Sequence, residues 1–227
     1  MDRFTLNRRR RRGQVVRTSA LLAAATVLTA LAVVAAGSAA PAATCSFCGK
    51  NLVLNPGAES GKGLTATGTN GAVPHWTSTE GQFGAAAYTG FGVGWFSASS
   101  KGPADKGKNY FFGGTTTAAT SAKASIGSQT VKLPAGSAGH KATLSGWLGN
   151  YSSNTASVRA TFTDAAGKTL MGIRIGPDST LGGGDMGLRT RTGTVPAGAT
   201  GVTVTITFTD HANYNLTGAD DISLVLA

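Results

Sequence analysis

The sequence NLVLNPGAESG, at residues 51–61, carries the clearest indication of fold in the chain. The apolar run from Leu52 to Leu54 predicts a short strand. A turn at residues 55–57 ends it, because proline fixes its own φ and glycine accepts positive φ. Glu59 follows directly and is one of nine carboxylates after residue 40. A carboxylate in this position is either solvated or a ligand for a hard cation such as calcium.

The last residues of the chain predict a partner for this segment. Asp220 and Asp221 begin a second apolar strand, which runs to Leu226. It would lie beside residues 52–54 if the two ends of the domain meet. Alternation of side chains places Asp220 on the inward side with Ile222, and Asp221 on the opposite side.

Three segments together resemble a known family. NLVLNPGAESG at 51–61, VPHW at 73–76 and ADDISLVL at 219–226 resemble the carbohydrate-binding modules of the galactose-binding-like β-sandwich type. Middle segments such as LSGWLGNY are similar to secreted bacterial relatives of that fold. The resemblance covers about residues 51–227 and implies a jelly-roll sandwich that binds a glycan. It also implies a structural Ca²⁺ held by Glu59 and by Asp220 or Asp221. We favour Asp221, because an inward carboxylate is costly to bury unpaired.

Residues 1–40 predict a cleaved secretory signal peptide. Five consecutive arginines at 8–12 precede an apolar, alanine-rich stretch at 20–36, and small residues follow at 37–40. This order of a positive region, an apolar region and small residues is typical of such signals. A membrane anchor is the alternative, but the apolar stretch is only marginally long enough to cross a bilayer. We therefore expect a secreted, extracellular protein with no membrane contact after cleavage.

The leader also accounts for most of the charge. Residues 1–40 contribute +6 to the net charge of +10, which leaves about +4 for the rest of the chain. A modest positive charge without arginines and lysines interleaved with aromatics does not suggest a nucleic-acid partner. The remaining length fits one domain with a sizeable core, which we expect to be a monomer.

A C-x-x-C motif, Cys45-Ser46-Phe47-Cys48, lies in the predicted N-terminal arm at 41–50. Such a motif can be a redox pair, half of a zinc site or a local disulfide. Zinc would need two more soft ligands, and no other cysteine exists. A thioredoxin-like role requires a helix after the motif, whereas a strand follows here. We expect a disulfide between Cys45 and Cys48, as is usual in an oxidising compartment.

The rest of the chain, residues 51–227, predicts an all-β fold. It is rich in glycine, serine and threonine, and runs of strong helix formers are missing. Many short strands separated by turn residues are typical of an antiparallel β-sandwich. The expected strands are at about 73–77, 81–89, 109–113, 122–133, 140–149, 155–164, 167–175, 187–195, 201–209 and 219–226.

Alternation within these strands selects candidate ligand-binding residues. In 202–209, valine, isoleucine and phenylalanine share one face and four threonines share the other. The same rule points Trp147, Arg159 and Arg174 outward. If their strands adjoin, one face combines a tryptophan, arginines and hydroxyls, a combination suited to sugars. The alternative is that Trp147 is covered by a loop or packs in a second small core.

Two further aromatic residues are candidates for the binding site. Trp95 lies in a loop rich in glycine and serine at 90–100, and Tyr151 lies in another predicted loop. An exposed aromatic on a loop suggests recognition, although the first loop could equally fold back over the sandwich.

No catalytic constellation is recognisable. His75, His140 and His211 are far apart in the sequence, and no common nucleophile, metalloprotease or phosphate-loop motif is present. The sequence therefore predicts a secreted, non-catalytic module that binds extracellular or cell-wall carbohydrate. The alternatives are a cell-surface protein-interaction module that uses the loop at 90–100, and an uncharacterised hydrolase.

Overall fold

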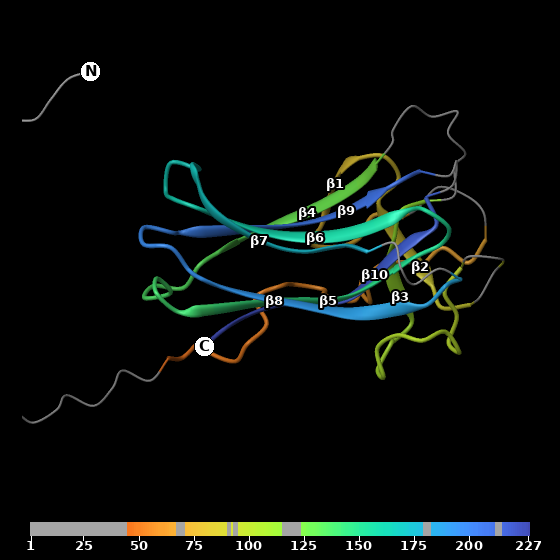
Figure 1. The fold of residues 1–227 in the computed structure, drawn as a ribbon, viewed down its shortest axis with the longest axis horizontal. Helices are drawn as coiled ribbons and strands as arrows, with labels where there is room; N and C mark the ends of the chain where they lie inside the picture. Colours follow the sequence, from red (N-terminus) through yellow and green to blue (C-terminus); the bar gives the residue numbers. More distant parts are fainter. Residues whose placement is uncertain are drawn as a thin grey trace, which may run out of the picture. The chain divides into compact units, whose positions relative to one another are not determined.

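Two layers of antiparallel strands form the part of the chain that the computed structural model describes (Figure 1). The described residues are 45–66, 71–89, 92, 95–114, 124–178, 183–211 and 215–227. The predicted signal peptide at 1–40 and residues 41–44 of the predicted arm lie outside them. Among the described residues, no helix has the length and hydrophobicity needed to span a membrane.

Each layer is a five-stranded sheet, with strand orders β1-β4-β9-β6-β7 and β2-β3-β10-β5-β8. The all-β antiparallel sandwich predicted from the sequence is therefore confirmed. The strands are β1 (Thr77–Glu80), β2 (Gly84–Ala87), β3 (Asn109–Phe112), β4 (Ala124–Lys132), β5 (Lys141–Asn150), β6 (Thr155–Thr163), β7 (Thr169–Asp178), β8 (Met186–Thr194), β9 (Gly201–Thr209) and β10 (Thr217–Leu226).

The prediction of a strand at 52–54 is wrong, although this segment does lie beside β10 as expected. Only a single antiparallel bridge forms there, between Asn51 and Val225. The backbone of Leu54 instead forms hydrogen bonds with a side chain. Leu54 N–H donates to Gln129 Oε1 over 2.9 Å, and Gln129 Nε2 donates to the Leu54 carbonyl over 2.9 Å. The amide of Gln129 thus takes the place of a neighbouring strand.

The strand expected at 73–77 is displaced to Thr77–Glu80. His75 has a φ of 70°, which is incompatible with extended backbone, so residues 73–76 form a turn. Trp76 after this turn is 7 % exposed and packs edge-on against Phe111 at 4.8 Å.

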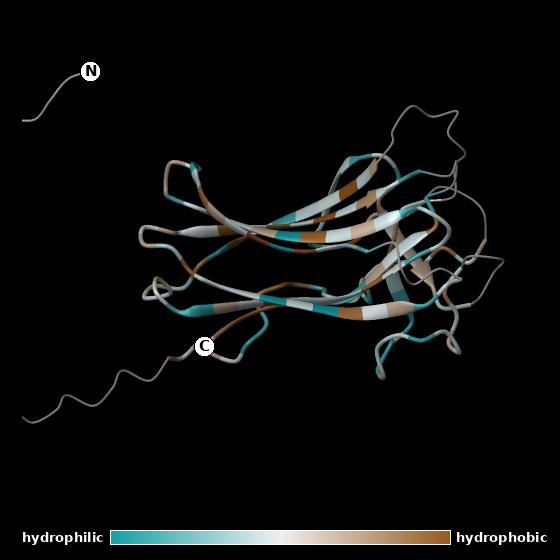
Figure 2. Ribbon diagram, in the orientation of Figure 1, coloured by the Kyte–Doolittle hydropathy of each residue, from teal (hydrophilic) through white to brown (hydrophobic). Residues whose placement is uncertain are grey.

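The main core lies between the two sheets and is built by period-two alternation. Apolar and polar residues alternate along strands of both layers (Figure 2). β9 shows it most completely, because its apolar side chains are all 0 % exposed while the intervening threonines are half-buried. Those four core residues are Val202, Val204, Ile206 and Phe208.

A second apolar cluster covers the outer side of the sheet β2-β3-β10-β5-β8. In β3, Phe111 points into the main core, while Tyr110 and Phe112 belong to the second cluster. Trp95 and Phe96 fold back onto it, and Trp95 lies 4.7 Å from Phe112, ring centre to ring centre. The described part of the loop at 90–100 therefore covers the sheet and does not display exposed aromatics.

Candidate functional site

The two ends of the folded domain are held together by hydrogen bonds. Gly49 N–H donates to the Leu226 carbonyl and Leu52 N–H donates to the Leu224 carbonyl, each over 2.9 Å. The side chain of Asn51 bonds to β10 in both directions. It donates to the Ile222 carbonyl over 3.0 Å and accepts from Leu224 N–H over 2.9 Å. The expectation that residues after 50 lie beside the last strand is met.

A β-bulge in β10 corrects the predicted orientation of the two aspartates. The pairing of β10 with β5 shifts register between Asp220 and Ser223, and Asp221 has a φ of 49°. Asp220 is the register partner of Trp147, on the side of the second cluster and not on the side of Ile222. Simple alternation failed here because the bulge inserts one residue without a partner.

Four carboxylates gather at this end of the sandwich, namely those of Glu59, Asp105, Asp220 and Asp221. Asp220 is 1 % exposed and accepts a hydrogen bond from the Tyr88 hydroxyl over 2.6 Å. Burial, together with repulsion from Asp221 and Glu59, raises the pKa of Asp220 to about 8.

The pKa of Asp221 is also raised, for similar reasons. Burial, followed by repulsion from Asp105 and Glu59, raises its pKa to about 6. Gly57 is packed tightly against both aspartates, because a Cβ at this position would lie 2.9 Å from Asp220 Oδ1. Asp105 was not among the candidates predicted from sequence. Its place in a lysine-rich turn gave no sign that it would meet the last strand.

Glu59 is oriented by the backbone at the start of β3. Its carboxylate accepts hydrogen bonds from Lys108 N–H over 2.9 Å and from Asn109 N–H over 2.9 Å. Glu59 and the aspartates form an all-oxygen donor set with clustered negative charge, which is the chemistry that Ca²⁺ prefers. The residues therefore fit a hard cation by donor type and charge. Among the described acidic side chains, no three bring their oxygens within 4.8 Å of one another.

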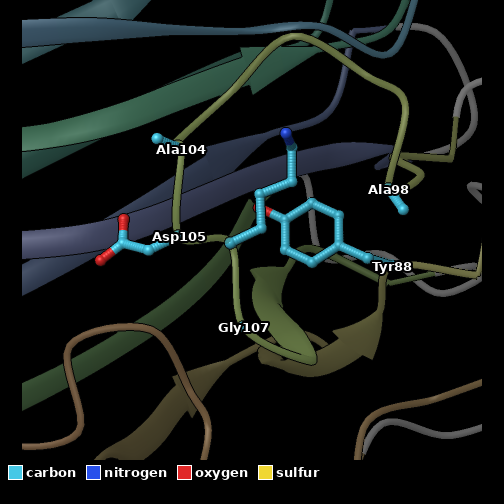
Figure 3. A pocket seen from close by; sticks show the side chains of 6 residues that line it. Tyr88, Ala98, Ala104, Asp105 and Gly107 are labelled. Carbon is cyan, nitrogen blue, oxygen red and sulfur yellow. The ribbon is translucent and has the colours of Figure 1, made fainter.

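A pocket of about 480 Å³ lies next to these acids (Figure 3). Its lining includes Tyr88, Asp105 and Lys106, and Figure 3 shows the ring of Tyr88 extending toward the turn at 104–107. Burial and the neighbouring carboxylate of Asp220 raise the pKa of Tyr88, so its hydroxyl keeps its proton and donates.

The outward side chains of β4, β9, β6 and β7 form a second candidate surface, which we call the polar face. Its strands pair in register, so side chains from different strands form straight rows. One row contains Thr130, Thr203 and Thr161, and the first two hydroxyls lie 2.8 Å apart. The next row contains Ser128, Thr205, Arg159 and Arg174.

Arg159 and Arg174 are direct cross-strand neighbours on the polar face, and both are exposed. Arg174 donates to the Ser157 hydroxyl over 3.1 Å, and the Arg159 guanidinium lies over Gly172. Within the described residues, neither guanidinium forms an ion pair with a carboxylate. Two like charges placed opposite each other destabilise a sheet. This pair therefore lowers the stability of the folded protein when no anion lies between the two guanidiniums.

Trp147 does not share the polar face, which corrects the expectation of one combined surface. It lies on β5, in the other sheet, where it is half-buried and packs against the second cluster. Its neighbour on β8 is Leu188, which is 51 % exposed. Tyr151 also packs against the second cluster, and Trp95 within it is only 8 % exposed. The predicted binding residues are therefore divided between opposite sides of the sandwich.

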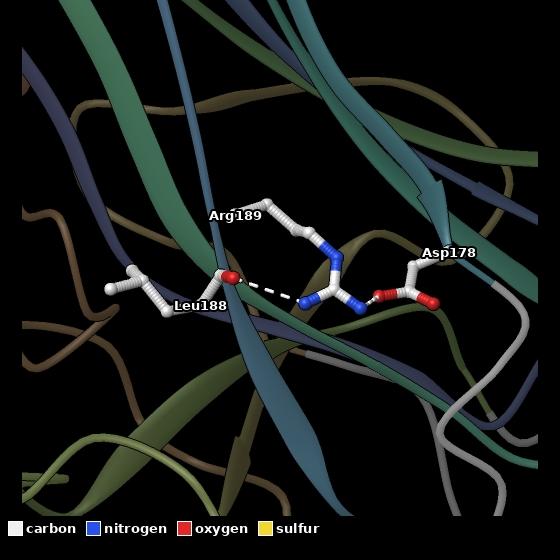
Figure 4. A network of polar contacts seen from close by, with 3 residues as sticks. All are labelled: Asp178, Leu188 and Arg189. Carbon is white, nitrogen blue, oxygen red and sulfur yellow. Dashed lines mark hydrogen bonds and ion pairs between the residues drawn. The ribbon is translucent and has the colours of Figure 1, made fainter.

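Arg189 has a structural role, because it forms an ion pair between the two sheets. Arg189 on β8 pairs with the buried Asp178 at the end of β7 and donates to the Leu188 carbonyl over 3.0 Å (Figure 4). This ion pair links the edge strands of the two sheets.

The predicted arm carries a disulfide between Cys45 and Cys48. The structure also brings His140 to it, with His140 Nδ1 3.7 Å from Cys48 Sγ. These residues are 92 positions apart. The sequence spacing therefore gave no indication that this histidine lies beside the motif.

Comparison with known proteins supports the fold. The sequence matches no protein-family model and no curated protein. The enzymatically active domain of tailspike protein 4 of bacteriophage CBA120 is similar in structure, with a TM-score of 0.52 and 15 % identity over 78 % of this chain and 21 % of that one. The chain thus spans about a fifth of the length of that solved domain.

Solved carbohydrate-binding modules are also among the similar structures. A family 61 module in complex with β-1,4-galactotriose has a TM-score of 0.49 and 15 % identity, over 78 % of this chain and 99 % of that one. A family 16 module has a TM-score of 0.47 and 18 % identity, over 77 % and 99 %. At 15 % identity, the tailspike domain shows a likeness of fold alone, and the two modules, with TM-scores below 0.5, add nothing to it.

Proposed function

We propose that this protein binds carbohydrate without transforming it, and that the polar face is the binding surface. The observation that carries the proposal is the row of Ser128, Thr205, Arg159 and Arg174, which ends in two guanidiniums that have no carboxylate partner in the part of the chain that the structure describes. Hydroxyl side chains recur about every 4.8 Å across the strands and about every 6.7 Å along them. Such a grid offers donors and acceptors over an extended area, as a hydroxyl-rich polymer requires.

The arginine pair points to acidic sugars as the ligand class. A guanidinium binds a carboxylate or sulfate through two parallel, charge-assisted hydrogen bonds. An anionic group between Arg159 and Arg174 would remove the repulsion that the two strands place there. We therefore propose an acidic polysaccharide as the ligand, with threonine and serine hydroxyls holding the neighbouring sugar rings.

The experiment is retention of the protein by immobilised polysaccharides, acidic ones such as polygalacturonate and neutral ones such as xylan. Arg159→Gln and Arg174→Gln should each weaken binding to the acidic polymer by roughly tenfold to a hundredfold, the range expected for hydrogen bonds to charged groups. Arg191→Gln is the matched control, because Arg191 is exposed on β8 of the other sheet. It should bind like the parent chain.

Three outcomes would contradict the assignment. The first is retention by none of the polymers, which would remove the carbohydrate function. The second is unchanged binding by both arginine variants. The third is loss of binding in Trp147→Ala with normal binding in Arg159→Gln, which would move the site to the exposed patch beside Leu188.

The non-catalytic part of the proposal rests on the state of the gathered acids. A glycosidase needs two carboxylates that flank the scissile bond. Asp220 is 1 % exposed, and both oxygens of Glu59 accept backbone hydrogen bonds. Asp220 is thus buried away from any substrate, and the carboxylate of Glu59, although exposed, is held by the backbone at Lys108 and Asn109. Release of reducing sugar from a bound polymer would contradict this part.

We further propose that the acids bind a structural Ca²⁺, with Glu59, Asp220 and Asp221 as charged ligands and Asp105 beside them. The support is the gathering of four carboxylates at one end of the sandwich, whose mutual repulsion adds to burial in raising the pKa of both aspartates and would be relieved by a cation. A chelator should lower the thermal midpoint, and added Ca²⁺ should restore it. Glu59→Ala should abolish this response, whereas Glu80→Ala, an exposed acid on β1, should keep it. A midpoint unaffected by chelator would refute the ion.

Secretion is also a proposal, based on the arginine-rich and alanine-rich leader at 1–40. The expected observation is mature protein in the medium with a new N-terminus near residue 41. Full-length protein retained in the cells would contradict it.

A further inference from the structure

We infer that the reduced chain binds one Zn²⁺ through Cys45, Cys48 and His140, a function independent of carbohydrate binding. The sulfur of Cys48 lies 3.7 Å from His140 Nδ1, and the ligand atoms of all three residues lie within 4.8 Å of one another. A C-x-x-C motif with a histidine supplies soft sulfur and imidazole nitrogen, the donors that zinc prefers.

The distances suit a tetrahedral zinc centre. Zn–S bonds of about 2.3 Å and Zn–N bonds of about 2.05 Å place a sulfur and a nitrogen about 3.6 Å apart, and two sulfurs about 3.8 Å apart. The observed 3.7 Å between Cys48 Sγ and His140 Nδ1 already matches the first distance. After reduction, the two sulfurs must move apart to about 3.8 Å. Side-chain rotation supplies this, because the Cα atoms are 5.3 Å apart.

The site is held in place by contacts that do not depend on the disulfide. The ring of Phe47 packs edge-on against His140 at 5.3 Å. Gly49 N–H donates to the Leu226 carbonyl, and the His140 carbonyl accepts from Val195 N–H, both over 2.9 Å. Reduction therefore leaves the motif next to the histidine. All three ligands are half-buried, so a metal ion can reach them.

The chemistry balances with a phosphine as the reductant. The phosphine takes an oxygen atom from water and becomes a phosphine oxide, and the disulfide accepts two electrons and two protons to give two thiols. Zn²⁺ then binds both sulfurs as thiolates and releases two protons to the buffer, while neutral His140 donates its Nδ1 lone pair. The fourth position is left for water. The oxidised chain lacks thiolates and cannot form this centre.

The test is a zinc titration of the full chain in competition with a chromophoric chelator, before and after phosphine treatment. Excess Ca²⁺ is included to occupy the acids near Asp220. We expect one equivalent of zinc on the reduced chain and none at this site on the oxidised chain. Co²⁺ in place of zinc should give the sulfur-to-metal charge-transfer absorption of a thiolate site.

Variants identify the ligands. The double variant Cys45→Ser/Cys48→Ser should bind no zinc. His140→Ala should lose at least about tenfold in affinity, since even partners of metal ligands contribute that much. His211→Ala, at an exposed histidine elsewhere, should bind normally. If His140→Ala fails to fold, carbethoxylation of His140 in the parent chain replaces it, and zinc should protect the ring only after reduction. Absence of zinc on the reduced chain, equal binding by the oxidised chain, unchanged affinity of His140→Ala or an unprotected ring would each overturn the inference.

Discussion

Replacing Asn51 by alanine tests how the two ends of the domain are joined. The Asn51 amide makes three hydrogen bonds. Nδ2 donates to the Ile222 carbonyl over 3.0 Å, and Oδ1 accepts from Leu224 N–H over 2.9 Å and from Val53 N–H over 3.0 Å. No backbone ladder can take over, because the segment forms only one bridge to β10. Alanine removes all three bonds together.

The expected loss follows from these contacts. Each bond contributes about 0.5–1.5 kcal/mol, so three contribute about 1.5–4.5 kcal/mol. Asn51 is itself exposed, and water can replace part of what is lost, so we expect about 2 kcal/mol. For a domain of this size, that corresponds to a fall in thermal midpoint of about 4–8 °C.

Scanning calorimetry measures the thermal midpoint of Asn51→Ala. Saturating Ca²⁺ keeps the proposed ion site equally occupied in all variants. Leu54→Ala is the matched control, because Leu54 belongs to the same segment and is 52 % exposed. Its midpoint should stay close to that of the parent chain, as is usual for exposed positions. If the thermal midpoint of Asn51→Ala equals that of Leu54→Ala, the amide does not join the ends and the reasoning fails.

Three other perturbations have definite expected outcomes. Gly127→Ala should lower the free energy of unfolding by about 1–3 kcal/mol in denaturant titrations, because its Cβ would overlap the ring of Phe83; an unchanged midpoint would contradict this packing. Trp95→Ala should lose about 3–5 kcal/mol of stability yet keep its polysaccharide affinity, since the ring is buried on Phe112. In chelator, the thermal midpoint should fall as pH rises from 5 to about 8, because folded Asp220, with its raised pKa, retains a proton that the unfolded chain releases; a midpoint that rises would refute the burial of this acid.

The fold could be predicted because alternation is a local property. In β9, each apolar residue is followed by a threonine, and the pleat alone sends them to opposite sides. The order of strands within the sheets is not local. Nothing in the sequences of β5 and β6 shows that they belong to different sheets, so Trp147 and Arg159 were expected on one surface and lie on two.

The acidic site was predicted in part. The resemblance brought Glu59 and the aspartate pair together, and the structure places them at the same end of the sandwich. The orientation of Asp220 could not be predicted, because the bulge at Asp221 shifts the side chains that follow it. Asp105 and His140 were missed for a different reason. Each meets its neighbours only through tertiary contacts that span many residues.

The bridge between Asn51 and Val225 has a consequence for protein engineering. Bridge partners on adjacent segments lie about 5 Å apart, so a linker of a few residues could connect the segment at Asn51 to the end of β10. New ends could then be opened at the exposed β6–β7 hairpin, where Asp164 and Gly167 form the turn. Such a circularly permuted chain would keep every strand pairing. By the same geometry, the domain could be grafted into a surface loop of another protein without separating the points where that loop begins and ends.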